Sequence, residues 1–581
     1  MLTAGDSKKN KMGAGSLRWR RLWLAGAAVW CVSVPVACMT PSRAVRETDE
    51  VGTRLATAYW QSQTGSTNAF DVNRAADALT LRIALLAAAR GEQSVVFPSI
   101  PHAAPEVLSN AVLRLSVTDA LCVAARNDRQ YQKLKEAVFN RALDLDYQQY
   151  LFETSFSGMM LMLLTGDPGV EKASGRLQAG ATRQLPNGAE IAGGLALDVV
   201  SLLRDDWRSA AFTGDLTVTV PLMRGAGRDI VREPLTQAER NLIYAVRAFD
   251  NYRKSYAVLV ANGYFDVLEA AQYLKNASEN ERRLSRNSKR AEMLFEAGRM
   301  QRIQVDQART DLLKAELSVI NYRRSFESKR DAFKVVIGLP PESRVELDGA
   351  ELQMLEDLMA EIAASSTSAV ASFPDEEESL RIALAERDDL YVMRCQFEDA
   401  ARGVKVAADA LKADVALSGG GDLSRKHVTG GDGFEGQEAW TAGLKTSFPW
   451  DRRKERNAFK KQLLALEQSR RSLEELEDGV KLSVRNGRRN LLAARAAYEN
   501  QVQSMRVALL RVESNNLYLQ SGRSTMRDVL EAESALLTAR NAFCSAVIDW
   551  RLSELELRRD MGVLSISEAG MWIKADGDKH G

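Results

Sequence analysis

Apolar residues follow two different periods along the chain, one of three to four residues and one of two. After Gly522 they recur in alternating steps of three and four, interrupted once by Ser553 before Leu557. This spacing is typical of a coiled-coil seam, a narrow stripe by which one helix packs on another. The seam comprises Val529, Ala532, Leu536, Ala539, Phe543, Ala546, Trp550 and Leu557. We therefore predict a long helix after a turn at Gly522.

The same seam occurs 224 positions earlier in the chain. Gly298 corresponds to Gly522, and Gly338 corresponds to Gly562. Between Gly298 and Gly338 the seam comprises Val305, Ala308, Leu312, Ala315, Val319, Tyr322, Phe326 and Phe333. The preceding segments match as well, with Val260-Ala-Asn-Gly263 over Val484-Arg-Asn-Gly487. The sequence predicts an internal duplication of long helical hairpins.

Segments with a period of two separate the helices in each copy. Leu216, Val218 and Val220 alternate with polar residues, and so do the apolar residues of 440–448. This pattern indicates strands with one apolar and one polar face. The segments 189–200 and 413–423 precede them as partners, and Pro221 and Pro449 end the two runs because proline cannot continue a ladder. We predict four strands per chain.

The predicted helices describe a rod. In the second copy, a helix of ~35 residues leads into the strands, one of ~68 leaves them and one of ~36 returns after Gly522, so that the long helix measures ~100 Å. Four strands cannot close a membrane barrel, which needs about eight, and an open sheet would leave unpaired backbone in lipid. Three chains would supply about 12 strands to one barrel. The periodicity requires an oligomer or an aqueous role for the sheet, and it does not itself give the number three.

The N-terminus has the pattern of a bacterial export signal. Basic residues between Lys8 and Arg21 precede the apolar run 22–34, which is short for a membrane span and is interrupted by Pro35. The run ends in Val36-Ala37-Cys38, which resembles a lipoprotein box whose cysteine is acylated. Met39 rather than Asp follows, which in such proteins directs the product to the outer membrane. Cleavage after Ala44 is the alternative.

Composition excludes several classes of function. The 581 residues contain 78 Lys and Arg against 77 Asp and Glu, so no excess charge indicates a nucleic-acid partner. Three cysteines beyond Cys38 and three histidines in the whole chain offer no disulfide framework, metal site or cofactor site. Gly431-Asp-Gly433-Phe-Glu-Gly436 fits GxGxxG but lacks a following helix, and we interpret it as a loop between strands. No enzymatic motif was found, and we expect no catalytic residues.

The duplicated order, the strand ends at Pro221 and Pro449, the two Gly-Arg turns and Ile337-Gly338-Leu-Pro resemble the TolC-like outer-membrane efflux factors. The resemblance covers about Leu115 to Leu564. It implies a mainly α fold with a small β part: a homotrimer whose 12-stranded barrel in outer-membrane lipid continues as an α-helical barrel through the periplasm. It also implies an exit duct of a tripartite efflux or type I secretion system, with no chemistry, which a periplasmic adaptor and an inner-membrane transporter open at the helical tips.

This resemblance divides the chain into successive parts. Residues 1–37 are the export signal, 38–114 an N-terminal segment and linker, 341–373 an equatorial segment and 565–581 a tail. The first repeat spans 115–340, with strands about 179–220 and its tip at 297–299. The second spans 374–564, with strands about 413–448 and its tip at 521–523.

The tips carry the residues that the family uses. Acidic residues six and nine positions after the second-repeat glycine ring the closed aperture in the family, and here these are Asp528 and Glu531. The alternative is that both acids simply begin a helix, where negative charge is favoured. The surfaces expected to face an adaptor are Ala297, Gly298, Arg299, Ser521, Gly522 and Arg523. The chain departs from the family pattern at Leu519, Ser524 and Gln304, so the family's gating contacts do not carry over.

Two other classes of protein remain open. A periplasmic adaptor also uses long helical hairpins, but it would carry one hairpin in a small β-rich domain rather than two with matched strands. A structural coiled coil without a pore would leave the alternating strands unexplained. The transported substrate and the pump class are not encoded in any motif that we recognise.

Overall fold

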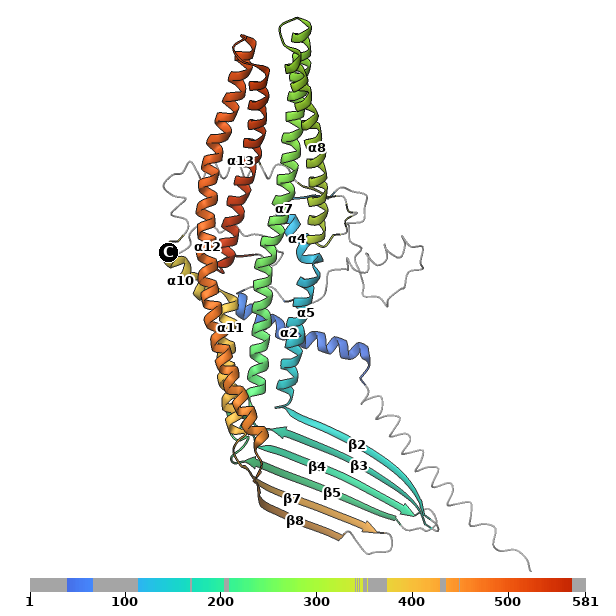
Figure 1. Ribbon diagram of the computed structural model, residues 1–581. Helices are drawn as coiled ribbons and strands as arrows, with labels where there is room; N and C mark the ends of the chain where they lie inside the picture. The colour runs from blue at the N-terminus through green and yellow to red at the C-terminus, as the bar shows by residue number, and fades with distance from the viewer. Residues whose placement is uncertain are drawn as a thin grey trace, which may run out of the picture.

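The computed structural model describes residues 39–65, 70, 113–167, 170–202, 208–339, 341, 343, 345–347, 353, 374–428, 435–448 and 450–566. Figure 1 shows an elongated molecule in which long helices run side by side and a sheet lies obliquely at one end. The export signal, residues 431–434 of the GxGxxG motif, most of the segment 341–373 and most of the tail lie outside the described residues, whereas Glu435 and Gly436 of the motif begin a strand.

Two helical hairpins form most of the rod. Helix α7 (Glu233–Glu296) pairs with α8 (Arg302–Val336), and α12 (Arg453–Gln520) pairs with α13 (Met526–Asp560). Their lengths are 64, 35, 68 and 35 residues. Both α8 and α13 begin and end 224 positions apart, which confirms the predicted duplication.

Shorter helices complete each repeat. They are α4 (Val117–Asn127) and α5 (Arg129–Tyr150) in the first repeat, and α10 (Glu376–Glu386) and α11 (Asp388–Asp409) in the second, with α2 (Pro41–Thr64) and α6 (Arg228–Val231) besides. The single helix of ~35 residues that the sequence predicted before the second strands is therefore divided at Arg387. The backbone of Arg387 is extended there, and its guanidinium donates to the carbonyl oxygen of Asp560 at 3.2 Å and to the Asp389 carboxylate. The break is thus stabilised by the end of α13.

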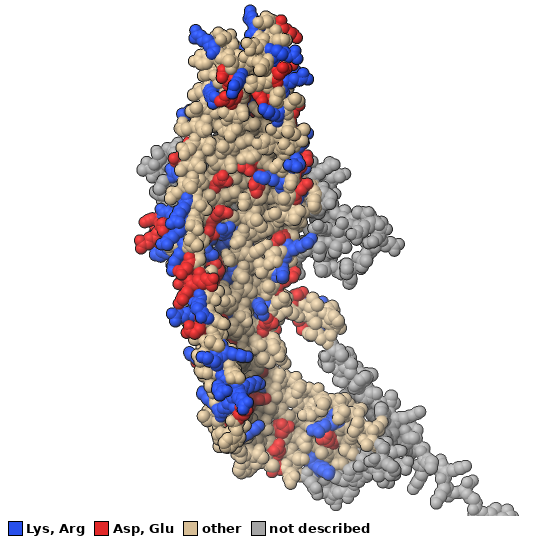
Figure 2. All heavy atoms as spheres, in the orientation of Figure 1, with Lys and Arg blue, Asp and Glu red and all other residues tan. Residues whose placement is uncertain are grey.

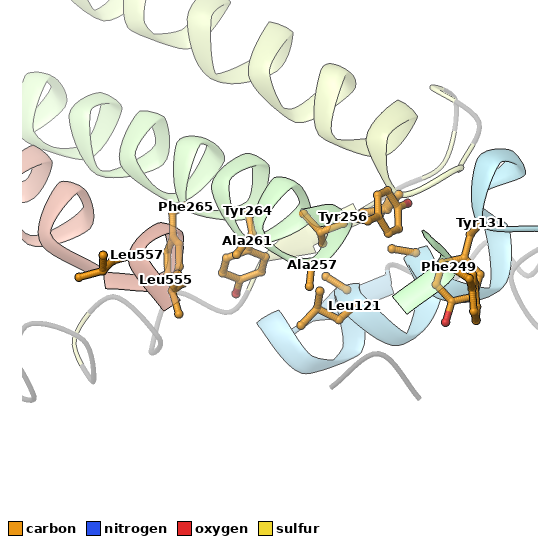
Figure 3. Packing of buried hydrophobic residues seen from close by; sticks show 14 of the residues in the cluster. Leu121, Tyr131, Phe249, Tyr256, Ala257, Ala261, Tyr264, Phe265, Leu555 and Leu557 are labelled. Carbon is orange, nitrogen blue, oxygen red and sulfur yellow. The ribbon is translucent and has the colours of Figure 1, made fainter. Parts of the chain in front are cut away.

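The core lies where the first-repeat helices meet the long hairpins. Figure 3 shows aromatic and aliphatic side chains of α4, α5, α7 and α13 in one buried cluster. Tyr264 at its centre is fully buried, and its hydroxyl donates to the carbonyl oxygen of Leu115 at 3.2 Å. Helix α2 joins this core through Trp60, whose ring centroid lies 5.5 Å from that of Phe249. Strand β1 (Leu113–Leu115) pairs in parallel with β6 (Val345–Leu347), which links the start of the first repeat to the segment between the repeats.

The large sheet differs from the prediction of four strands. In the described part of the chain it contains six antiparallel strands in the order β2-β3-β4-β5-β7-β8. Their bounds are Thr154–Asp167, Val170–Gln184, Glu190–Leu202, Arg208–Pro221, Asp414–Val428 and Glu435–Ser447. The first-repeat strands thus begin at Thr154 rather than at about 179, and the expected four strands per chain were wrong.

Strand β2 was not predicted from the sequence, and the reason is physical. Its residues Met159 to Leu164 are apolar at every position, so the strand has no period of two. Such a run is ambiguous between a strand and a buried helical segment. With six strands in the described part of each chain, the expected 12-stranded trimeric barrel does not follow from this sheet.

Candidate functional site: the sheet and the helical tips

The strand register gives the sheet one continuous apolar face. Trp440 lies opposite Gly421, and the same row continues through Leu216 to Phe156. Along each strand, every second residue counted from this row lies on the same face. On most of the sheet these residues are apolar or glycine. The large exposed members include Met160, Met162, Leu164, Leu177, Leu195, Leu197, Val199, Phe212, Val218, Leu417 and Leu444. An exposed apolar area of this extent indicates contact with lipid or with another chain.

The opposite face is polar on five of the six described strands. It carries side chains such as Gln178, Asp198, Asp215, Asp422 and Lys445, which alternate with the apolar face. Arg176 lies 3.6 Å from Asp198 on this face. A sheet with one apolar and one polar face suits a membrane wall around an aqueous lumen.

The glycine turns at the far end of the rod have the expected geometry. Gly298 and Gly522 have φ values of 70° and 72°, a conformation that glycine adopts without steric cost. The amide of Arg299 donates to the carbonyl oxygen of Leu294 at 2.8 Å, and the amide of Arg523 donates to that of Tyr518 at 2.9 Å. These are Schellman-type helix ends. The residues 297–299 and 521–523 are exposed at the two tips.

Asp528 participates in a capping box at the start of α13. Its carboxylate accepts from the Thr525 amide at 2.8 Å, from the Thr525 hydroxyl at 2.6 Å and from the Ser524 hydroxyl at 3.1 Å. The hydrogen bonds from Thr525 lower the pKa of Asp528, so this side chain is ionised at neutral pH. The departure at Ser524 thus has a local role, since its hydroxyl contributes to the cap.

Glu531 lies one turn further along α13. Its carboxylate pairs with Arg511 of α12 at 2.9 Å, and both side chains are about half exposed. An exposed pair of this kind contributes little to stability. Both predicted aperture acids therefore lie at the tip of the second hairpin with partners inside their own chain.

The two tips are joined by packing that the sequence analysis missed. Met526 and Leu530 of the second hairpin lie in one buried cluster with Leu284 and Ala291 of the first, and Leu519 packs against that cluster. Nearby, Arg283 of α7 pairs with the buried Glu533 of α13 at 2.7 Å. Arg540 also reaches Glu279 at 2.8 Å. No periodicity identifies these charges, because each belongs to an ordinary charged helix face until the two hairpins meet.

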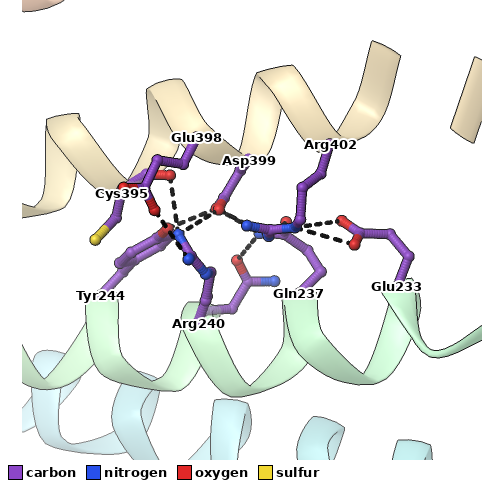
Figure 4. A network of polar contacts seen from close by, with 9 residues as sticks. Glu233, Gln237, Arg240, Tyr244, Cys395, Glu398, Asp399 and Arg402 are labelled. Carbon is purple, nitrogen blue, oxygen red and sulfur yellow. Dashed lines mark hydrogen bonds and ion pairs between the residues drawn. The ribbon is translucent and has the colours of Figure 1, made fainter. Parts of the chain in front are cut away.

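A second ionic network joins the repeats near the sheet (Figure 4). Asp399 of α11 accepts from Arg240 of α7 at 2.9 Å, from Arg402 at 2.8 Å and from the Tyr244 hydroxyl at 2.5 Å. Burial, together with the bond to Asp399, raises the pKa of Tyr244. Figure 2 shows further charged side chains along the helices and gathered at the tips.

The remaining predictions concern the N-terminus and the cysteines. Cys38 lies outside them, and the alternative cleavage position Ala44 lies in α2. Cys122, Cys395 and Cys544 form no disulfide with one another, and no cluster of metal ligands occurs in the ranges that the structure describes. None of the described helices is long and apolar enough to cross a membrane.

The sheet with two distinct faces and the paired hairpins define a class: a membrane channel subunit with a long helical extension. Comparison with protein families matches residues 199–339 and 380–563 to the family described as outer membrane efflux protein. The chain belongs to this family. It is a non-enzymatic outer membrane efflux channel of tripartite systems, located in the outer membrane with a helical extension in the periplasm, and the family implies a trimer.

Solved structures share this fold at low sequence identity. The MtrE outer membrane channel of Neisseria gonorrhoeae, solved in its open state, matches with a TM-score of 0.54 and 13% identity over 77% of this chain and 89% of that chain. The CmeC outer membrane channel of Campylobacter jejuni matches with a TM-score of 0.53 and 12% identity over 83% and 96% of the two chains. The outer membrane protein VceC of Vibrio cholerae gives 0.52 and 13% over 77% and 96%. No curated protein matches the sequence.

Proposed function

We propose that this chain forms a passive exit duct that is closed at its helical tips and is opened when a periplasmic adaptor docks there. One observation carries this proposal: the two tips of one chain are held together by the Met526 and Leu530 packing and by the ion pair of Arg283 with the buried Glu533. An adaptor that separated or rotated the hairpins would have to exchange these contacts for its own. The adaptor-facing residues are the exposed turns 297–299 and 521–523.

The energy for transport comes from an inner-membrane transporter, because the chain offers no motif for chemistry of its own. Cys38 is acylated in this proposal, which would anchor each mature N-terminus in lipid. An efflux pump is the favoured partner, and a type I secretion system is the alternative with the same architecture.

Three copies of Asp528 and Glu531 ring the closed aperture in this proposal. Asp528 is held ionised by its cap, and Glu531 is exposed, so both can act on ions in a narrow mouth. Their field would favour cations over anions and would bind multivalent cations.

The experiment compares currents in planar bilayers for the wild-type trimer and the variant with Asp528→Ala and Glu531→Ala. We expect the wild type to conduct ions with a preference for cations and to be blocked by multivalent cations. The double variant should lose both the cation preference and the block. Because Asp528→Ala also removes a cap, the control is Asp119→Ala, which opens the matching capping box of α4 far from the tips. A monomeric, non-conducting protein would refute the duct, whereas unchanged selectivity in the double variant would remove only the acidic ring.

A further inference from the structure

The extra hairpin β2–β3 is an insertion into the first repeat. Helix α10 begins 259 positions after α4, and α11 begins 259 positions after α5. From β4 onward, corresponding elements of the two repeats lie only 224 positions apart, since β7 begins 224 positions after β4. The first repeat therefore contains 35 residues more than the second between α5 and β4, which is the length of a β-hairpin with its connections.

The inserted hairpin is continuous with the rest of the sheet. Strand β3 pairs with β4 over Lys172 to Gln184, and β2 pairs with β3 over its full length. The hairpin also starts and ends at one place, because Thr154 lies opposite Arg183. Figure 1 shows β2 and β3 beside β4, at the same slant to the helices as the other strands.

The hairpin keeps the apolar face of the sheet intact. Phe156, Met160, Met162 and Leu164 of β2 lie on the same face of the sheet as Leu195 and Leu216, and so does Leu177 of β3. Each strand has 13 to 15 residues, compared with the roughly 9 to 11 that cross a bilayer when tilted. The hairpin therefore has the length and the outer surface of a membrane-spanning pair.

We propose that β2–β3 forms part of the barrel wall, so that the trimer closes with 18 strands, six from each described sheet, rather than 12. This inference rests on the proposed duct and its trimer. With neighbouring strands about 4.8 Å apart and tilted about 40°, 18 strands give a backbone diameter of about 36 Å, against about 24 Å for 12. The wider wall suits the passage of bulkier cargo than a 12-stranded duct admits.

Closure joins β2 of one copy to β8 of the next. These strands are the two edges of the described sheet, and their unpaired backbone groups could not remain bare in lipid. They run in opposite directions because the sheet is antiparallel throughout with an even number of strands, so the neighbouring edge continues the alternation.

The lumenal faces of the two edges are complementary in size. Met159, Leu161 and Leu163 give β2 three successive large apolar residues on the polar face. Strand β8 presents Ala439, Thr441 and Gly443 on the same face. Large side chains beside small ones pack closely, which supports the second copy's β8 as the partner of β2.

Cysteine cross-linking distinguishes the two barrels. In full-length protein carrying Cys122→Ala, Cys395→Ala and Cys544→Ala, with Cys38 kept, Thr441→Cys is combined with a second cysteine on the lumenal face. One series places it in β2 at Ser155, Ser157, Met159, Leu161 or Leu163. The matched series places it in β4 at Ala192, Gly194, Ala196 or Asp198.

We expect oxidation to give covalent dimers and trimers when the second cysteine is at one or two adjacent positions of β2. No position of the β4 series should give such cross-links. Cross-links through β4 would overturn the proposal, because they would place the hairpin outside a 12-stranded wall while leaving the duct intact. A conducting trimer that cross-links with neither series would overturn it as well. A monomeric, non-conducting protein would instead refute the proposed function, so the two failures are separable.

A deletion provides an independent check. Removing residues 154–184 joins Glu153 to Leu185 near the point where the hairpin ends meet. We expect the shortened chain to cross-link from Thr441→Cys to β4, and its barrel to exclude neutral polymers that enter the full-length barrel from the extracellular side. Equal polymer cut-offs for the two proteins would contradict the wider wall.

Discussion

At the scale of single residues, the most informative side chain is Glu533. It is 3% exposed and pairs with Arg283 at 2.7 Å across the two hairpins. The Nη2 atom of Arg283 has no hydrogen-bond partner among the described residues, and Glu279 lies 3.8 Å from its Nη1 atom, so Glu533 is the nearer of the two acids that compensate this charge. A buried ion pair is weak evidence that the pair adds net stability. Removing only one of its two residues is nevertheless costly, because the other charge then lacks compensation.

We predict that Glu533→Ala lowers the free energy of unfolding by about 3 kcal/mol, because Arg283 would keep only its longer contact with Glu279 in a largely buried place. Thermal and urea unfolding of the trimer in detergent would measure this loss. The matched control is Glu474→Ala, whose pair with Arg470 is about 60% exposed on both sides and should change stability by less than about 0.5 kcal/mol. Equal effects of the two substitutions would show that the tip pair is not buried in the assembly.

At the scale of elements, the glycines that end the four hairpin helices α7, α8, α12 and α13 fall into two kinds. Gly298, Gly338, Gly522 and Gly562 all have positive φ, between 70° and 79°. Added Cβ atoms at Gly298 and Gly522 would meet open space, whereas one at Gly562 would lie 3.0 Å from the carbonyl carbon of Glu386. The turns at the tips therefore need glycine for backbone conformation alone, and those at the other ends also need it for close packing.

We predict that Gly522→Ala costs about 1 kcal/mol, the usual cost of a left-handed conformation for alanine. Gly562→Ala should cost about 3 kcal/mol, since backbone must also move away from the new methyl group. Unfolding of the two variants side by side would test the difference. A cost at Gly522 as large as at Gly562 would mean that another copy packs on this turn.

At the scale of the whole molecule, ionic networks hold the two repeats together. Asp399 receives hydrogen bonds from Arg240, Arg402, Tyr244 and Gln237, and its side chain is 11% exposed. Its neighbour Glu398 reaches the same Arg240 but is 61% exposed. The pair of acids thus offers a comparison of a buried and an exposed charge on one helix.

We predict that Asp399→Ala destabilises the protein by about 3 kcal/mol, because two guanidinium groups lose a buried partner. Glu398→Ala should cost less than about 1 kcal/mol, and high salt should reduce its effect further. Denaturation of both variants at low and high salt would measure this. If Glu398 proved the more important acid, the contact between α7 and α11 would differ in the assembled channel.

Much of this architecture was predictable because it depends on local periodicity. The seams beginning at Val305 and Val529 and the turns at Gly298 and Gly522 correspond to the observed hairpins residue by residue. The inserted hairpin left a signal that was not used, namely the change in repeat spacing between α5 and β4. Asp528 and Glu531 were found by position, but their partners Ser524, Thr525 and Arg511 were not.

The sequence by itself determined the elements, because seam spacing, strand alternation and glycine turns act over a few neighbouring residues. The tertiary structure alone decided which elements meet: β5 against β7 across the repeats, β2 at the edge of the sheet, and Arg283 against Glu533. The last of these contacts joins residues 250 positions apart. Such contacts depend on the whole chain excluding water from two surfaces at once, and no local pattern records which surfaces those are.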